Sequence, residues 1–187
     1  CVEIDNNLTE EKLKNLINDL VSMKKDKSLL IAHLCSIYGN YVVNEFVIQI
    51  TKDMLDNQKN SGYDLKSATD SVESEIKNKY INGIPRSIKP GLNNLSTELN
   101  NFVEQFKRID PNKIAEEINP ILSILGEVND MPEFNYEAYS KGTLFTNMSS
   151  AKLLTADEEK FWSVINGLDN IKKRRQDIKN AVNAAIE

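Results

Sequence analysis

The feature that most constrains the fold is an apolar stretch over residues 29–50 that leaves hardly any polar face. A helix that is apolar almost all round has to be buried, so this stretch predicts a helix in the middle of the fold. The alternative is a strand over residues 41–50, which are rich in β-branched side chains, but no other stretch offers a partner strand. The apolar residues are Leu29, Leu30, Ile31, Leu34, Ile37, Tyr38, Tyr41, Val42, Val43, Phe46, Val47, Ile48 and Ile50.

This stretch does not read as a membrane span, and the composition is that of a globular chain. The longest uncharged run, residues 28–44, is shorter than the roughly 20 apolar residues that a bilayer needs, and it contains His33, Asn40 and Asn44. The chain has 187 residues, of which 40% are hydrophobic, a length that suits one domain with its own core. Its net charge of −5 argues against nucleic acid as a partner, because phosphate binding relies on clustered Lys and Arg.

Helical spacing of apolar residues continues on both sides of the stretch. A first helix is predicted over residues 10–24, with Thr9 as its N-cap and Leu13, Leu16, Ile17 and Leu20 as its apolar stripe. The charged residues 25–27 predict a turn, after which Ser28 can cap the apolar helix, which runs to about residue 56. Two more helices are predicted within residues 65–80 and 92–106, separated by a connection with two prolines and two glycines.

Proline placement predicts the next helices. Asp110-Pro111 is an N-cap followed by proline at the first helical position, and Asn119-Pro120 repeats the arrangement. Residues 111–128 therefore form two short helices or one helix kinked at Pro120.

The last 33 residues carry the clearest pattern, which predicts one long C-terminal helix. Thr155 and Glu158 have the spacing of a capping box. About 31 residues would follow in a helix of roughly 46 Å. A repeat of this kind demands a facing helix, and its seam consists of Phe161, Val164, Leu168, Ile171, Arg175, Ile178, Val182 and Ala185.

Taken together, these patterns predict an all-α fold. Residues 1–187 form a single-domain bundle of five to seven helices with a central buried apolar helix and one long C-terminal helix. Residues 1–9 are an N-terminal segment, and residues 129–154 are a long connection.

The chemical inventory predicts a non-enzymatic protein with no cofactor and no metal. His33 is the single histidine, and it cannot assist Cys35 as a base, because residues two apart on a helix point to nearly opposite sides. Zinc sites need several Cys or His ligands, and the chain has three such residues in all.

Two segments are candidate surfaces for a protein partner. The connection holds Phe134, Tyr136, Tyr139 and Phe145, whose rings would give large contact areas, unless they fold back as a lid over the bundle. The second segment is the basic run over residues 172–175, with Lys172 and Arg175 as its candidate contacts. The alternative is that this run is an ordinary solvated helix face.

Arg175 is informative by itself, because it occupies a seam position between Ile171 and Ile178. Either the bundle is open there and the guanidinium reaches water, or it meets a carboxylate of another helix or of a second subunit.

Cysteine usage favours export. The chain begins at Cys1, as it would after removal of a signal peptide or in a lipoprotein whose first cysteine is acylated; a chain cut from a longer protein is the third origin. A disulfide between Cys1 and Cys35 would contribute roughly 3 to 4 kcal/mol. Otherwise Cys35 is a small buried apolar residue. We therefore expect a secreted or cell-surface protein.

The leading functional hypothesis is an exported helical bundle that binds an extracellular or cell-surface protein. Two alternatives are a carrier of an apolar small molecule such as a fatty acid inside the bundle, and a self-assembling structural protein that forms a homodimer through its C-terminal helix. An enclosed void of roughly 300 Å³ or more would distinguish the carrier from a packed scaffold.

Overall fold

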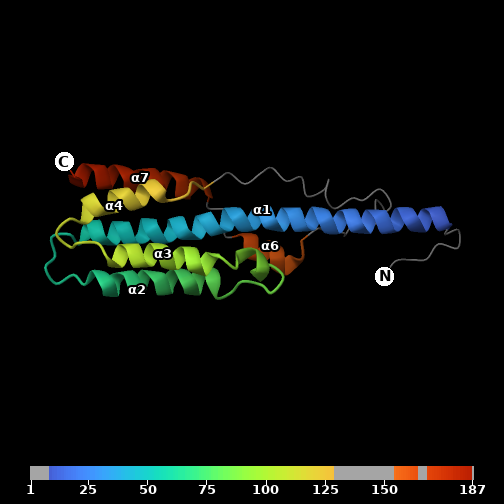
Figure 1. Ribbon diagram of the computed structural model, residues 1–187, viewed down its shortest axis with the longest axis horizontal. Coiled ribbons are helices and arrows are strands. Elements are labelled where there is room, and N and C mark those ends of the chain that lie inside the picture. Colours follow the sequence, from blue (N-terminus) through green and yellow to red (C-terminus); the bar gives the residue numbers. More distant parts are fainter. Residues whose placement is uncertain (1–8, 129–153, 164–167, 187) are drawn as a thin grey trace.

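The computed structural model describes residues 9–128, 154–163 and 168–186, which form an all-α bundle around one long helix (Figure 1). That helix, α1 (Glu10–Asp56), has 47 residues, which corresponds to about 70 Å at 1.5 Å per residue. The C-terminal half of α1 lies among the other helices, and its N-terminal half projects beyond them (Figure 1). The described residues contain no strand, so the strand alternative for residues 41–50 is wrong.

The other helices pack on two sides of α1. On one side lie α2 (Leu65–Ile76), which continues as the π-helical turn η1 (Lys77–Ile81), and α3 (Leu95–Lys107), preceded by the 3-10 turn η2 (Lys89–Leu92). On the other side lie α4 (Ile114–Ile124) and α7 (Leu168–Ile186), which also contact each other. The short helix α6 (Ala156–Trp162) packs beside the middle of α1.

The predicted burial of the apolar stretch is confirmed from Leu30 onward. Its most buried side chains form the centre of the core, where Phe46 meets Phe106 of α3 edge to face with ring centroids 5.9 Å apart. Leu29 is the exception, because 62% of its side chain is exposed. Apolar side chains of α1 with at most 1% exposure are Leu30, Leu34, Tyr38, Val42, Phe46, Val47, Ile50 and Met54.

The predicted turn at residues 25–27 is wrong, because α1 runs through it without a break. The sequence there is Lys25-Asp26-Lys27, which contains neither glycine nor proline, and charged side chains on an exposed helix do not end it. Ser28 does not cap a new helix. Its hydroxyl donates to the carbonyl of Lys24 one turn earlier, at 3.0 Å.

The predicted single C-terminal helix is also wrong, because α6 and α7 are separate helices on different sides of α1 (Figure 1). Asn166-Gly167 lies between them in the sequence, and glycine weakens a helix interior by about 1 kcal/mol relative to alanine. The capping box at the start of α6 is confirmed. Thr155 Oγ1 accepts from the Glu158 backbone N–H at 3.2 Å, and Glu158 Oε1 accepts from the Thr155 N–H at 2.9 Å.

The region of the two predicted proline caps contains one helix, α4, and neither cap begins it. Pro120 lies inside α4, so it does not begin a second helix. Pro111 precedes the helix, whose N-cap residue is Lys113. Asp110 caps a tight turn before the helix, since its carboxylate accepts from the backbone N–H of Asn112 at 2.9 Å.

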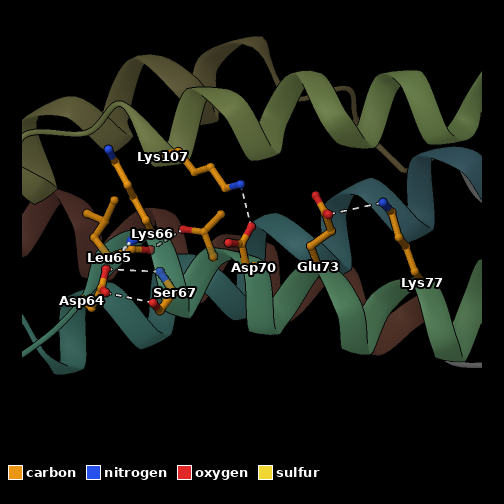
Figure 2. Close-up of polar contacts among 9 residues, drawn as sticks. Asp64, Leu65, Lys66, Ser67, Asp70, Glu73, Lys77 and Lys107 are labelled. Carbon is orange, nitrogen blue, oxygen red and sulfur yellow. Dashed lines mark hydrogen bonds and ion pairs between the residues drawn. The ribbon is translucent and has the colours of Figure 1, made fainter.

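Figure 2 shows how α2 begins and how it meets α3. The carboxylate of the N-cap residue Asp64 accepts from the Ser67 hydroxyl at 2.8 Å and from the backbone N–H groups of Lys66 and Ser67 at 3.2 Å. These bonds hold the pKa of Asp64 below its usual value. Farther along α2, the carboxylate of Asp70 lies 2.5 Å from the ammonium of Lys107 on α3. The cap fixes where α2 starts, and the ion pair joins its exposed side to α3.

Candidate binding groove between α1 and α7

A groove of about 680 Å³ lies between the last turns of α1 and the helix α7. It is open to solvent along its length. Its lining combines apolar side chains with charged ones: Ile48, Gln49, Lys52, Asp53, Leu55, Asp56, Arg174, Asp177, Ile178 and Ala181. Three further hollows, of about 250, 320 and 340 Å³, are also open.

Two adjacent arginines of α7 bind two adjacent residues of α1 beside the groove. Arg174 donates hydrogen bonds from both of its terminal nitrogens to the carboxylate of Glu45. Arg175 donates a hydrogen bond to the side-chain oxygen of Asn44 at 2.7 Å. Asn44 and Glu45 are buried, with exposures of 1% and 3%. Because two neighbouring residues on each helix pair with each other, the two helices have one fixed register.

Arg174 forms part of the groove wall, and Glu45, the partner in its ion pair, is buried. The carboxylate of Glu45 also accepts from the side-chain amide of Gln49 at 2.9 Å. The hydrogen bonds and charge of Glu45 raise the pKa of Arg174, against the opposing effect of partial burial. The carboxylate of Glu45 thus neutralises the positive charge of Arg174 in the absence of a ligand.

Arg175 is buried and does not face the groove. Besides Asn44, its guanidinium donates to the backbone carbonyls of Leu125 and Gly126, at 2.8 and 2.5 Å. These carbonyls follow the C-terminal end of α4, where the helix dipole favours a cation. Desolvation lowers the pKa of Arg175, and the charge of Glu127 opposes that shift. The sequence-based alternative that Arg175 reaches water is therefore wrong, and among the described residues its guanidinium binds an amide oxygen and two backbone carbonyls. Pairing with a carboxylate of a second subunit stays a prediction.

The charge that remains around the groove is mostly negative. Lys52 contributes one positive charge, against the carboxylates of Asp53, Asp56 and Asp177. Asp53 is held in place by the hydroxyl of Tyr63, which donates to its Oδ2 at 2.5 Å. Since Arg174 is balanced by Glu45, a ligand meets an apolar floor bordered mainly by acids.

Of the predicted partner residues, the structure describes Lys172 and Arg175. Phe134, Tyr136, Tyr139 and Phe145 lie outside the described residues. Lys172 is exposed on α7, whereas Arg175 of the same basic run is buried and holds α7 to α1 and α4. The basic run is accordingly divided between the surface and the interior.

Sequence reasoning missed the groove residues. Asp56, Asp177 and Ala181 come from segments 120 residues apart, and each has an unexceptional place in a helical repeat. No local signal marks them, because the groove exists only where α7 docks beside the end of α1.

Of the two cysteines, the structure describes Cys35. Cys1 lies outside the described residues, so its pairing with Cys35 stays a prediction. Cys35 is buried and has no disulfide partner among the described residues, and burial raises the pKa of its thiol to about 11. It packs against Gly91 so closely that a Cβ atom at position 91 would lie 2.5 Å from its Sγ. His33, two residues away, is exposed, so the two side chains lie on different sides of α1.

A second buried carboxylate holds α6 to the bundle. Glu158 is 2% exposed, and it accepts from the ammonium of Lys27 at 2.9 Å and from the hydroxyl of Ser87 at 3.3 Å. Burial alone would raise its pKa, but the hydrogen bonds from Thr155 and Lys27 outweigh burial and hold the pKa below its usual value. Next to it, Phe161 and Trp162 pack on Tyr38 of α1, with ring centroids 4.8 and 5.8 Å away.

The fold and groove define a helical bundle with an open, amphipathic groove between two of its helices. Comparison of the chain with protein-family models, with curated proteins and with solved structures finds no match. Within the described ranges, no helix is both long and apolar enough to span a bilayer, and no three His, Cys, Asp or Glu side chains gather as metal ligands would.

Proposed function

We propose that this protein is a non-enzymatic binding protein that engages a protein partner through the groove between α1 and α7. The observation that carries the proposal is the groove itself, an open hollow of about 680 Å³ with an apolar floor and charged borders. Protein grooves of this composition accept the apolar face of an amphipathic helix, whose flanking charges set specificity.

The charges around the groove specify the chemistry of the occupant. Ile48, Leu55, Ile178 and Ala181 offer apolar contact, and Asp53, Asp56 and Asp177 outnumber Lys52. The fitting ligand is therefore a helical segment with apolar residues at i, i+3 and i+4 and with Lys or Arg beside them.

The packing of the bundle supports surface binding over carriage of an apolar small molecule. Tyr38, Phe46 and Phe106 fill the centre with at most 1% exposure. The four hollows described above open at the surface and are not enclosed by the bundle. A fatty-acid carrier would yield co-purified lipid on extraction of the native protein.

We further propose that the protein acts outside the cell, because a disulfide between Cys1 and Cys35, which we also propose, forms and persists in oxidising compartments. The intact mass of natural material tests this proposal. It reports an acyl group on Cys1, or the loss of two protons when Cys1 and Cys35 form a disulfide. A mass without either change, together with a cytoplasmic location in fractionated cells, would contradict it.

Selection from a displayed library of helical peptides tests the groove. We expect enriched peptides to carry the apolar and basic pattern, and to lose binding to Ala181→Trp, which fills the groove, and to the double variant Asp56→Lys, Asp177→Lys, which reverses its charge. Ala184→Trp and Glu75→Lys are matched controls, because both residues are exposed and neither lines the groove. Peptides that bind the groove variants as well as the controls, or a selection without enrichment, would overturn the proposal.

A further inference from the structure

The projecting half of α1 is a helix without a covering partner among the described residues. Every side chain that the structure describes from Glu10 to Lys25 is exposed. Two of them are large and apolar, Leu13 at 43% and Ile17 at 51% exposure. They lie four residues apart and therefore share one face of the helix.

An isolated helix of this length is marginal in water, because most helical stability in proteins comes from packing of an apolar face. The same face is covered farther along α1. Lys27 pairs there with Glu158, and Tyr38 packs on Phe161 and Trp162 of α6. The side of α1 that α6 contacts from Lys27 onward thus continues toward Glu10, where no other described residue covers it.

The charges beside Ile17 complement a second copy of this chain. Glu10 and Lys24 lie seven residues before and seven after Ile17, so all three share a face after two helical turns on either side. Both charged side chains are exposed. A two-fold axis at Ile17 places two α1 helices antiparallel, with Glu10 of each facing Lys24 of the partner subunit. The contact is self-complementary, as the interface of a symmetric dimer has to be.

We propose that the projecting half of α1 is a homodimerisation surface, on which two copies pair antiparallel around Ile17. The dimer uses a face different from the C-terminal seam, since Ile171, Ile178 and Val182 of that seam are buried within one chain. The antiparallel arrangement puts residues 48–56 of the two copies at opposite ends, about 100 Å apart at 1.5 Å per residue. Provided that the groove binds as proposed above, the assembly is bivalent for ligands that display two copies of the binding segment.

Charge reversal in the full-length chain tests this arrangement, with the dimer dissociation constant measured by analytical ultracentrifugation over a dilution series at low salt. Glu10→Lys turns both attractive pairs into repulsive ones, and we expect a dissociation constant roughly tenfold higher. Lys24→Glu has the same effect, and the double variant Glu10→Lys, Lys24→Glu restores the dimer. Glu11→Lys is the matched control, because it makes the same charge change one residue away, outside the apolar face.

A second pair of variants separates dimer formation from folding. Ile17→Asp removes the central contact and yields a monomer whose far-ultraviolet circular dichroism still shows a folded bundle. Leu29→Asp is its control, since Leu29 is exposed on another face of α1.

A wild-type chain that stays monomeric at the highest concentration overturns the proposal, because its α1 face is then covered by its own chain or by a different partner. A dimer that Glu10→Lys weakens no more than Glu11→Lys does, or that the double variant fails to restore, also overturns it. None of these outcomes depends on the groove, so the two proposals fail separately.

Discussion

At the scale of single residues, a few buried polar side chains decide how the helices meet. Asn44 and Glu45 of α1 receive Arg175 and Arg174 of α7. The basic run reads as a uniform surface patch in the sequence, yet consecutive helical residues are 100° apart around the axis. Lys172 and Lys173 therefore face solvent while the two arginines face α1.

Removal of Arg175 is expected to destabilise the fold strongly. Arg175→Ala leaves the carbonyls of Leu125 and Gly126 and the amide of Asn44 without their shared donor, and breaking such a buried contact costs about 2–5 kcal/mol. Lys173→Ala, two residues away and exposed, should change the unfolding free energy by less than about 0.5 kcal/mol. Urea denaturation of both variants measures the difference, and equal effects would contradict the assigned role of Arg175.

Glu158 should give the stability a dependence on acidic pH. Its pKa in the folded protein lies below the ordinary value of 4.5, so the unfolded state takes up its proton first as the pH falls. The stabilisation is complete above the unfolded-state pKa and is lost as the pH falls through the folded-state pKa. Glu158→Gln should flatten the unfolding free energy over this range, whereas Asp157→Asn, on the exposed side of the same turn, should not. A wild-type profile that Glu158→Gln leaves unchanged would rule out this role.

At the scale of elements, α1 joins the two helices expected over residues 10–24 and 28–56 into one, and the C-terminal helix is shorter than expected. Both differences follow from helix propensity. Charged residues such as Lys and Asp can continue a helix, whereas glycine weakens it. Lys25-Asp26-Lys27 keeps α1 intact, and Asn166-Gly167 separates α6 from α7. The caps at Thr9 and Thr155 are where the sequence predicts them, since an N-cap depends only on residues within one turn.

The contact between α1 and η2 depends on the absence of a side chain at position 91. Gly91→Ala places a Cβ atom 2.5 Å from Sγ of Cys35, and such overpacking typically costs 1–3 kcal/mol. Cys35→Ala removes the clashing sulfur. We expect the double variant Gly91→Ala, Cys35→Ala to be more stable than the sum of the two single changes in thermal unfolding. Simple additivity would show that the two positions do not meet.

At the scale of the whole molecule, the described residues form a packed end and an end at which α1 projects alone. Around residues 34–54, most apolar side chains of α1 are buried by other helices, and the groove lies at this end. Around residues 10–25, the described side chains are exposed. One continuous helix thus joins the proposed ligand groove to the proposed dimer contact.

Hydrogen exchange should separate the two ends. Backbone amides of residues 34–54 are expected to exchange only through global unfolding, and those of residues 10–25 by local fraying that is faster by orders of magnitude in dilute solution. Mass spectrometry of exchanged peptides measures both. Uniform protection along α1 in the monomer would contradict the arrangement in Figure 1.

The sequence alone determined the fold class, the central burial of most of residues 29–50 and the N-caps Thr9 and Thr155, because these follow from hydrophobic periodicity and from hydrogen bonds within one turn. It did not determine the groove, the arginine contacts or the exposed face of α1. Those features join residues such as Glu45 and Arg174, which are 129 positions apart. Whether a charged residue is buried depends on which helix lies opposite it, and only tertiary packing decides that.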